Sequence, residues 1–206
     1  MARRDNPYRR PDHFTREAKQ RGFPARSVFK LEEIDRRVRL LRPGQRVLDL
    51  GAAPGSWSLY AAGRIGPGGK LLAMDLSPLA GAPPPNAQFR EGDALSLSTA
   101  DLALFAPYDV VLSDMAPRTT GTREADQAQS FELFMRALDI AEALLTPGGS
   151  FVGKIFMGAD FSNAKKRVKQ LFETERTIRP EGTRGSSFEI FLAGLGFRGA
   201  PAQPSK

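Results

Sequence analysis

A glycine-rich turn with acidic neighbours is the first segment of this sequence that could do chemistry. The run VLDLGAAPGSW, residues 47–57, reads as a buried strand, a sharp turn and the start of a helix. Gly51 and Gly55 are spaced G-x-x-x-G, and Pro54 removes a backbone donor where a pyrophosphate would need an N–H. The loop therefore predicts a nucleoside cofactor other than NAD.

Four aspartates are placed where they could hold such a cofactor. Asp49 and Asp114 would repel a pyrophosphate but suit the ammonium and sulfonium charges of S-adenosylmethionine. Asp75 ends the next β-rich run, where a carboxylate can accept both ribose hydroxyls, and Asp93 follows a third run and can bond the adenine amino group. Each acid alone could be a strand-end cap, but their joint spacing with Gly51 predicts S-adenosylmethionine and no metal.

Lys154 is unusual because it lies inside an apolar run, among Phe151, Val152, Ile155 and Phe156. Burying a lysine is costly unless it has a partner or a function, so we interpret Lys154 as functional.

The positions of these residues imply alternating strands and helices. Short β-rich runs occur at 46–50, 70–76, 108–113, 150–156 and 188–193. Helical periodicity covers 26–40, 124–145 and 161–172, and the second of these helices stops at Thr-Pro-Gly-Gly, residues 146–149. This rhythm predicts a mainly parallel sheet covered by helices on both faces, with ligands at the carboxyl ends of the strands.

Composition limits the remaining possibilities. The 206 residues, 41% hydrophobic and 26% charged, suit one soluble domain. The chain has no cysteine and one histidine, His13, which excludes disulfides, zinc–thiolate sites and the thiolate chemistry of RNA cytosine-C5 methyltransferases. No signal peptide or membrane span is apparent, so we expect a cytoplasmic protein that does not contact membranes.

Positive charge is concentrated at the N-terminus. The net charge is +7, and the first 26 residues alone contain eight basic and three acidic side chains. Such an arm is either a solvated tail or a nucleic-acid contact. We expect a basic N-terminal arm at 1–25, one catalytic domain at 26–198 and a disordered C-terminal tail at 199–206.

Several longer motifs resemble those of the FtsJ/RlmE family of 2'-O-ribose methyltransferases. They are ARSVFKLEEID (25–35), LDLGAAPGSWS (48–58), SDMAPRTTGT (113–122), GGSFVGKIF (148–156) and SSFEIFLAG (186–194). They follow the order and spacing of the family nearly from end to end, with Ser56 standing where a glycine is usual.

The resemblance implies a fold and a set of site residues. The expected fold is α/β: a single Rossmann-like methyltransferase domain with a mostly parallel seven-stranded sheet, an antiparallel last strand, and helices on both faces. The family's catalytic residues fall on Lys154, Lys30, Asp114 and Glu189, and its cofactor residues on Gly55, Trp57, Asp75, Asp93 and Asp114. Without the resemblance, Lys30 would be read as a surface lysine, Glu189 as a solvent-facing strand residue and Trp57 as core.

Lys154 admits two roles toward a ribose 2'-hydroxyl. As a neutral amine it would be the general base, a state that burial and the neighbouring Lys30 favour and that Asp114 and Glu189 oppose. As an ammonium it would align the hydroxyl oxygen instead. Arg118 stands where base amine methyltransferases carry a stacking aromatic residue, so methylation of a base amine is disfavoured.

Within this family the expected substrate is a uridine of 23S ribosomal RNA in the large subunit, acted on by a monomer. The arm and a basic helix with Lys165, Lys166, Arg167 and Lys169 could contact phosphates, although such a run is often only a solvated face. Three alternatives remain: a tRNA 2'-O-methyltransferase, a ribosome assembly factor whose methylation is incidental, and a small-molecule O-methyltransferase.

Overall fold

The computed structural model describes residues 13–181 and 188–199. Its helices are α1 His13–Gln20, α2 Val28–Val38, α3 Ser56–Ile65, α4 Arg123–Leu144 and α5 Phe161–Leu171, with a short 3-10 turn η1 at Ala100–Leu102. Its strands are β1 Arg46–Leu50, β2 Lys70–Asp75, β3 Ala87–Glu91, β4 Tyr108–Ser113, β5 Leu145–Phe156, β6 Phe172–Ile178 and β7 Glu189–Phe197.

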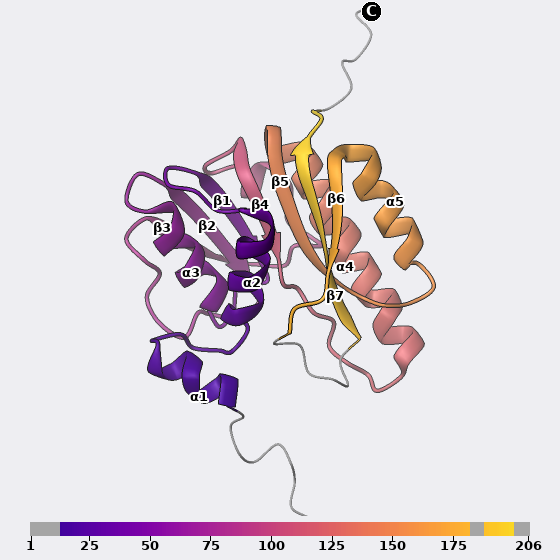
Figure 1. Ribbon diagram of the computed structural model, residues 1–206, viewed down its shortest axis with the longest axis horizontal. Coiled ribbons are helices and arrows are strands. Elements are labelled where there is room, and N and C mark those ends of the chain that lie inside the picture. Colours follow the sequence, from indigo (N-terminus) through magenta and orange to yellow (C-terminus); the bar gives the residue numbers. More distant parts are fainter. Residues whose placement is uncertain (1–12, 182–187, 200–206) are drawn as a thin grey trace, which may run out of the picture.

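These strands form one sheet in the order β3-β2-β1-β4-β5-β7-β6 (Figure 1). The pairings among β1 to β5 are all parallel, while β7 pairs antiparallel with both β5 and β6. The expected seven-stranded sheet with a reversed last strand is confirmed. Because β7 runs against its neighbours, it begins at the edge where the parallel strands end.

Two apolar cores lie on opposite faces of this sheet. Helices α2 and α3 cover one face through side chains such as Leu31, Ile34 and Trp57, which pack with Phe191 of β7. Helices α4 and α5 cover the other, where Phe134 packs with Phe151 and other strand side chains. Alternation along each strand supplies both cores, as expected for a sheet covered on both faces.

The strands predicted at 46–50 and 108–113 agree with β1 and β4, and the three predicted helices agree with α2, α4 and α5 within two residues at each end. β5 begins earlier than predicted, directly at Leu145. Its pairing with β4 shifts register after Tyr108, and Gly148 in this stretch has a φ of 82°. The Thr-Pro-Gly-Gly segment thus ends the helix but forms an irregular strand start instead of a loop.

Two elements, β6 and α1, were not predicted from the sequence. β6 has only Phe172 and Ile178 buried at its ends, because it is an edge strand with charged side chains between them. α1 lies within the basic arm and packs on α2 through Phe14 and Phe29, whose ring centroids are 5.6 Å apart. Residues 1–12 of the arm and 200–206 of the tail lie outside the described residues. No helix in the described part is long and apolar enough to cross a membrane.

Candidate active site

The carboxyl edge of the sheet gathers residues that are far apart in the sequence. β1, β2, β4 and β5 all end at this edge, and β7 begins there with Glu189 paired to Phe156. Asp75 is the last residue of β2, and Asp114 follows β4 with its N–H bonded to the Leu50 carbonyl at 3.1 Å.

Lys154 and Asp114 form a buried pair. Lys154 is only 7% exposed, and its Nζ donates to the Asp114 backbone carbonyl at 2.6 Å and lies 2.9 Å from Asp114 Oδ1. That Oδ1 is buried and accepts no hydrogen bond, so its contact with the Lys154 Nζ offsets its burial. A partner in the loop after the neighbouring strand β4 therefore offsets the cost of burying this lysine.

Lys30 and Glu189 form a second pair across 159 positions of sequence. The Lys30 Nζ lies 2.5 Å from Glu189 Oε1, and both side chains are little exposed, at 13% and 12%. Lys30 comes from the first turn of α2, and Glu189 is the first residue of β7. Helical periodicity marked Lys30 as solvated because periodicity cannot register a partner from another element.

The two pairs share one face of the sheet. Lys154 lies opposite Phe191 in the β5–β7 register, and Phe191 packs under α3 against Trp57. Since alternate residues of a strand share a face, Glu189 and Lys154 both point to the α2 side, on neighbouring strands. The structure thus brings all four predicted catalytic residues to one side of the carboxyl edge.

Asp49 is fully buried beside this set. Its Oδ2 accepts a hydrogen bond from the Ser58 hydroxyl at 2.5 Å, whereas its Oδ1 has no partner. Burial raises the pKa of Asp49 to about 7, assisted by the charges of Asp114 and Asp75 and opposed by the Ser58 hydrogen bond. An unpaired carboxylate oxygen among acidic neighbours is a fitting place for an organic cation.

The glycine loop is held tightly between β2 and β4. Gly51 has a φ of 78°, and a Cβ there would lie 2.7 Å from the backbone nitrogen of Met115. Asp75 Oδ2 accepts the Ala53 N–H at 2.9 Å, and its Oδ1 accepts the Ser77 N–H at 2.9 Å. Each carboxylate oxygen can accept a second hydrogen bond, so Asp75 can shape the loop and still receive ribose hydroxyls.

The start of α3 offers donors to an anionic group. Gly55 is its N-cap, with a φ of 114° and no side-chain cap. Uncapped N–H groups at a helix start, together with the helix dipole, favour a carboxylate. The Trp57 side chain is 2% exposed and donates from Nε1 to the Ser27 carbonyl at 2.9 Å, so only its backbone is left for a cofactor.

Groups of opposite polarity therefore flank the glycine loop, with carboxylates on one side and helix N–H groups on the other. This arrangement fits the zwitterionic amino-acid part of S-adenosylmethionine. Asp93, expected at the adenine, accepts the Leu95 N–H at 2.9 Å, which fixes the turn after β3. Among the described residues, no group of three possible metal ligands is present.

Sequence reasoning missed two serines that organise this site. Among the described residues, Ser58 donates the only hydrogen bond to the Asp49 carboxylate, and Ser56 bonds both backbone groups of Ala25, at 2.8 and 3.0 Å. The one available signal was Ser56 itself, which departs from the glycine usual in the resembling family. Nothing in the pattern around Ser58 distinguishes it from an ordinary helix residue.

The basic helix is only partly available to a polyanion. Lys165 pairs with Glu175 at 3.3 Å, and Arg167 pairs with Glu142 of α4. Lys166 and Lys169 are exposed. Two of the four predicted phosphate contacts are thus already engaged in ion pairs within the protein.

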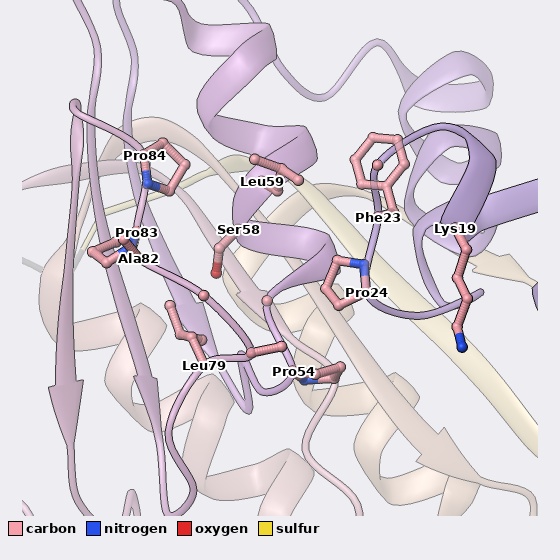
Figure 2. Close-up of a pocket in the computed structure, with 14 residues that line it drawn as sticks. Lys19, Phe23, Pro24, Pro54, Ser58, Leu59, Leu79, Ala82, Pro83 and Pro84 are labelled. Carbon is pink, nitrogen blue, oxygen red and sulfur yellow. The ribbon is translucent and has the colours of Figure 1, made fainter.

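A pocket of about 350 Å³ borders the glycine loop from the α3 side (Figure 2). The Phe23 ring, several prolines and Leu79 give it apolar walls, and the Lys19 side chain lies at one side. None of the four predicted catalytic residues lines it. Its lining residues are Lys19, Gly22, Phe23, Pro24, Pro54, Gly55, Ser58, Leu59, Leu79, Ala80, Gly81, Ala82, Pro83 and Pro84.

Comparison with known proteins adds independent information. The family model described as FtsJ-like methyltransferase matches residues 23–197. The chain is 71% identical to the ribosomal RNA large subunit methyltransferase E of Sorangium cellulosum, over 92% of this chain and 90% of that protein. It is 51% identical to the protein of the same name from Nitratidesulfovibrio vulgaris, over 91% and 95% of the two chains.

Solved structures agree on the fold. A putative ribosomal RNA methyltransferase from Plasmodium falciparum has a TM-score of 0.70 at 24% identity, covering 85% of this chain and 99% of its own. Fibrillarin from Aeropyrum pernix, solved with bound S-adenosylmethionine, has a TM-score of 0.54 at 16% identity, covering 75% and 67%. At these identities the likeness concerns the Rossmann-like methyltransferase fold alone.

Proposed function

Because this chain belongs to the FtsJ-like methyltransferase family, we propose that it methylates the ribose 2'-hydroxyl of a uridine in 23S ribosomal RNA, with S-adenosylmethionine as methyl donor. The substrate class is carried over from the 71% identical relative, whose name specifies ribosomal RNA of the large subunit. The observation that carries the chemistry is the buried Lys154–Asp114 pair at the carboxyl edge of the sheet.

The cofactor, when bound, supplies an electrophilic methyl group on a sulfonium. Asp49 and Asp114 would face its positive charges, and the N–H groups at the start of α3, after Gly55, would bind its carboxylate. Asp75 would accept hydrogen bonds from the ribose hydroxyls, and Asp93 would accept one from the adenine amino group. The unpaired Asp49 Oδ1 supports this assignment, because a buried carboxylate oxygen needs a cationic or donor partner.

Lys154 serves as the general base that removes the proton of the 2'-hydroxyl. Asp114 fixes the position of the amine through two contacts, at 2.6 and 2.9 Å. Lys30, held by Glu189, places a second positive charge on the same side of the sheet. Orientation for in-line attack and removal of the hydroxyl proton would both accelerate methyl transfer.

A second candidate mechanism keeps Lys154 as an ammonium that aligns the hydroxyl oxygen. Its favouring observation is that both Nζ contacts are with oxygen acceptors of Asp114, which stabilise a charged lysine. The pH–rate profile of methyl transfer separates the two. An ionisation near neutrality that changes in Lys154→Arg supports the base, and a flat profile through that range supports the aligning ammonium.

One chain contains all four catalytic residues, so we propose that it works as a monomer, in the cytoplasm where it meets ribosomal RNA. Basic side chains of the N-terminal arm and the exposed Lys166 and Lys169 of α5 would hold phosphates on either side of the target.

The test is methyl transfer from labelled S-adenosylmethionine to three substrates: assembled large subunits, protein-free ribosomal RNA and bulk tRNA, taken from a strain lacking the enzyme. Lys154→Ala is the matched control. Label recovered as a 2'-O-methyl uridine in ribosomal RNA, and lost in Lys154→Ala, supports the proposal.

Other outcomes redirect it. Label on tRNA alone makes the protein a tRNA 2'-O-methyltransferase. No transfer to any RNA contradicts the enzyme proposal. In that case, normal subunit assembly with Lys154→Ala protein, but not without the protein, identifies an assembly factor.

A further inference from the structure

An exposed aromatic ring lies next to the catalytic residues. Phe188 immediately precedes Glu189, and its side chain is 48% exposed. Its carbonyl accepts the N–H of Met157 at 2.9 Å, and Met157 is itself 43% exposed. Two large apolar side chains therefore face solvent at the edge where β5 ends and β7 begins.

A cation already covers one side of this ring. The Arg123 guanidinium carbon lies 4.0 Å from the centroid of Phe188. Arg123 is the first residue of α4, so the contact joins the loop after β4 to the start of β7. Stacked guanidinium and aromatic groups are a flat surface on which nucleobases stack readily, and the guanidinium edge can also contact a phosphate.

Among the described residues, no other exposed aromatic side chain adjoins the site. The loop after Asp114 contains Met115, Ala116 and Pro117, and exposed Arg118 follows where base amine methyltransferases carry a ring. Of the exposed large apolar side chains in the described residues, only Phe14 and Phe188 are aromatic, and Phe14 lies on α1. Phe188 is the one that adjoins Glu189.

We propose that Phe188 and Arg123 form a stacking platform for an unpaired nucleobase of the RNA strand at the reactive ribose. The proposal rests on the function proposed above and extends it to substrate positioning. Glu189 points to the α2 side, whereas Phe188, which directly precedes β7, contacts Arg123 of α4. The ribose and a base of the same strand would then lie on either side of the β7 start.

A protein partner suits this surface poorly. Two side chains offer far less apolar area than the roughly 800 Å² that each partner buries in a stable protein interface. A single nucleobase matches the size of one exposed ring.

The test compares two substitutions of the same residue. Phe188→Leu keeps an apolar side chain but removes the ring, and Phe188→Trp keeps a ring. Loss of one aromatic–base stack weakens binding by about 5- to 150-fold, so we expect this increase in the Kd of Phe188→Leu for transcribed 23S ribosomal RNA. Phe188→Trp should bind within about 3-fold of wild type. Leu104→Ala, at another exposed apolar residue, is the control and should leave the Kd unchanged.

Phe188→Trp also supplies a direct readout of stacking. The natural chain has one tryptophan, Trp57, which is 2% exposed, so the new indole dominates the change in fluorescence when RNA is added. If RNA quenches this fluorescence, and the additional substitution Arg123→Ala reduces the quenching, the stacking platform is supported. Unchanged fluorescence on saturation with RNA overturns it.

Kinetics separate this proposal from the proposed function. With a stacking role, Phe188→Leu raises KM for RNA while the Kd for S-adenosylmethionine and the melting temperature stay at wild-type values. If methyl transfer proceeds and Phe188→Leu matches wild type in KM and RNA affinity, the stacking proposal is overturned and the proposed function stands. If RNA binds and quenches the introduced indole but is not methylated, the proposed function fails and the stacking proposal stands.

Discussion

The hydroxyl of Ser56 bonds both backbone groups of Ala25, accepting its N–H at 2.8 Å and donating to its carbonyl at 3.0 Å. Ser56 is the first residue of α3, and Ala25 lies just before α2, which carries Lys30. The Trp57–Ser27 hydrogen bond joins the same two segments. The start of α3, directly after the glycine loop, is therefore joined to the start of α2, which carries a predicted catalytic lysine.

Replacing this hydroxyl should loosen both elements. In Ser56→Ala, two part-buried backbone groups lose their partner, which costs about 1 to 3 kcal/mol of unfolding free energy. We expect urea denaturation to report that loss, and the affinity for S-adenosylmethionine to fall as well. Ser162→Ala, on the exposed side of α5, is the control. Equal stability of the two variants would contradict the role of Ser56.

Asp49 should give the ligand-free protein a characteristic pH dependence. Its pKa is raised from 3.8 to about 7, so the folded state holds a proton that the unfolded state releases. Its contribution to stability is full below pH 4 and is lost as the pH rises through 7, by up to roughly 4 kcal/mol. Subtracting the pH profile of Asp49→Asn from that of wild type isolates this slope. A difference that does not change between pH 5 and pH 8 would rule it out.

Cofactor binding should be linked to the same proton. A cation beside Asp49 favours its ionised form, so binding of S-adenosylmethionine below pH 7 releases a proton and weakens as the pH falls. Calorimetry at pH 6 in two buffers of different ionisation enthalpy measures the release. We expect the signal to vanish in Asp49→Asn, and its persistence there would assign the proton to another group.

Lys154 should affect the methyl-transfer step far more than cofactor binding. Loss of a general base lowers kcat by about 100- to 10,000-fold, so we expect this range for Lys154→Ala in single-turnover transfer. A lysine elsewhere provides the comparison: Lys70→Ala removes an exposed amine and should leave kcat unchanged. Transfer by Lys154→Ala at more than about a tenth of the wild-type rate would exclude Lys154 as the base.

Two glycines provide a matched pair for the cofactor loop. Gly51→Ala combines a positive φ with a 2.7 Å approach to the Met115 nitrogen, so it should destabilise the fold by about 1 to 3 kcal/mol and reduce cofactor affinity. Gly63→Ala, inside α3 with nothing within 4 Å, should instead stabilise by up to about 1 kcal/mol. Thermal melting decides, and the same sign for both substitutions would refute the close approach at Gly51.

The two exposed lysines of α5 test how much of the basic helix contacts RNA. If Lys166 and Lys169 each neutralise a phosphate, Lys166→Ala/Lys169→Ala should lower the slope of log Kd against log salt by about 2. Lys165, already paired with Glu175, is the control, and its replacement should change the slope little. An unchanged slope in the double variant would make the helix a solvated face.

Much of this architecture was decided by local sequence. The strands at 46–50 and 108–113, the helix ends and the glycine turn follow from hydrophobic periodicity and backbone preference, which act between near neighbours. Aspartates at strand ends follow too, because parallel strands place their carboxyl ends at one edge. The resemblance to a family then selected Lys30 and Glu189, which periodicity alone assigned to solvent.

Only the tertiary structure decided which charges meet. The Lys30–Glu189 pair forms because β7 runs antiparallel and starts beside α2. The edge strand β6 joins the sheet through its pairing with β7. The Ser58–Asp49 bond, the Ser56–Ala25 bonds and the Arg123–Phe188 contact likewise join segments 9 to 65 residues apart. Such contacts depend on how elements pack, and no repeating pattern within one element encodes them.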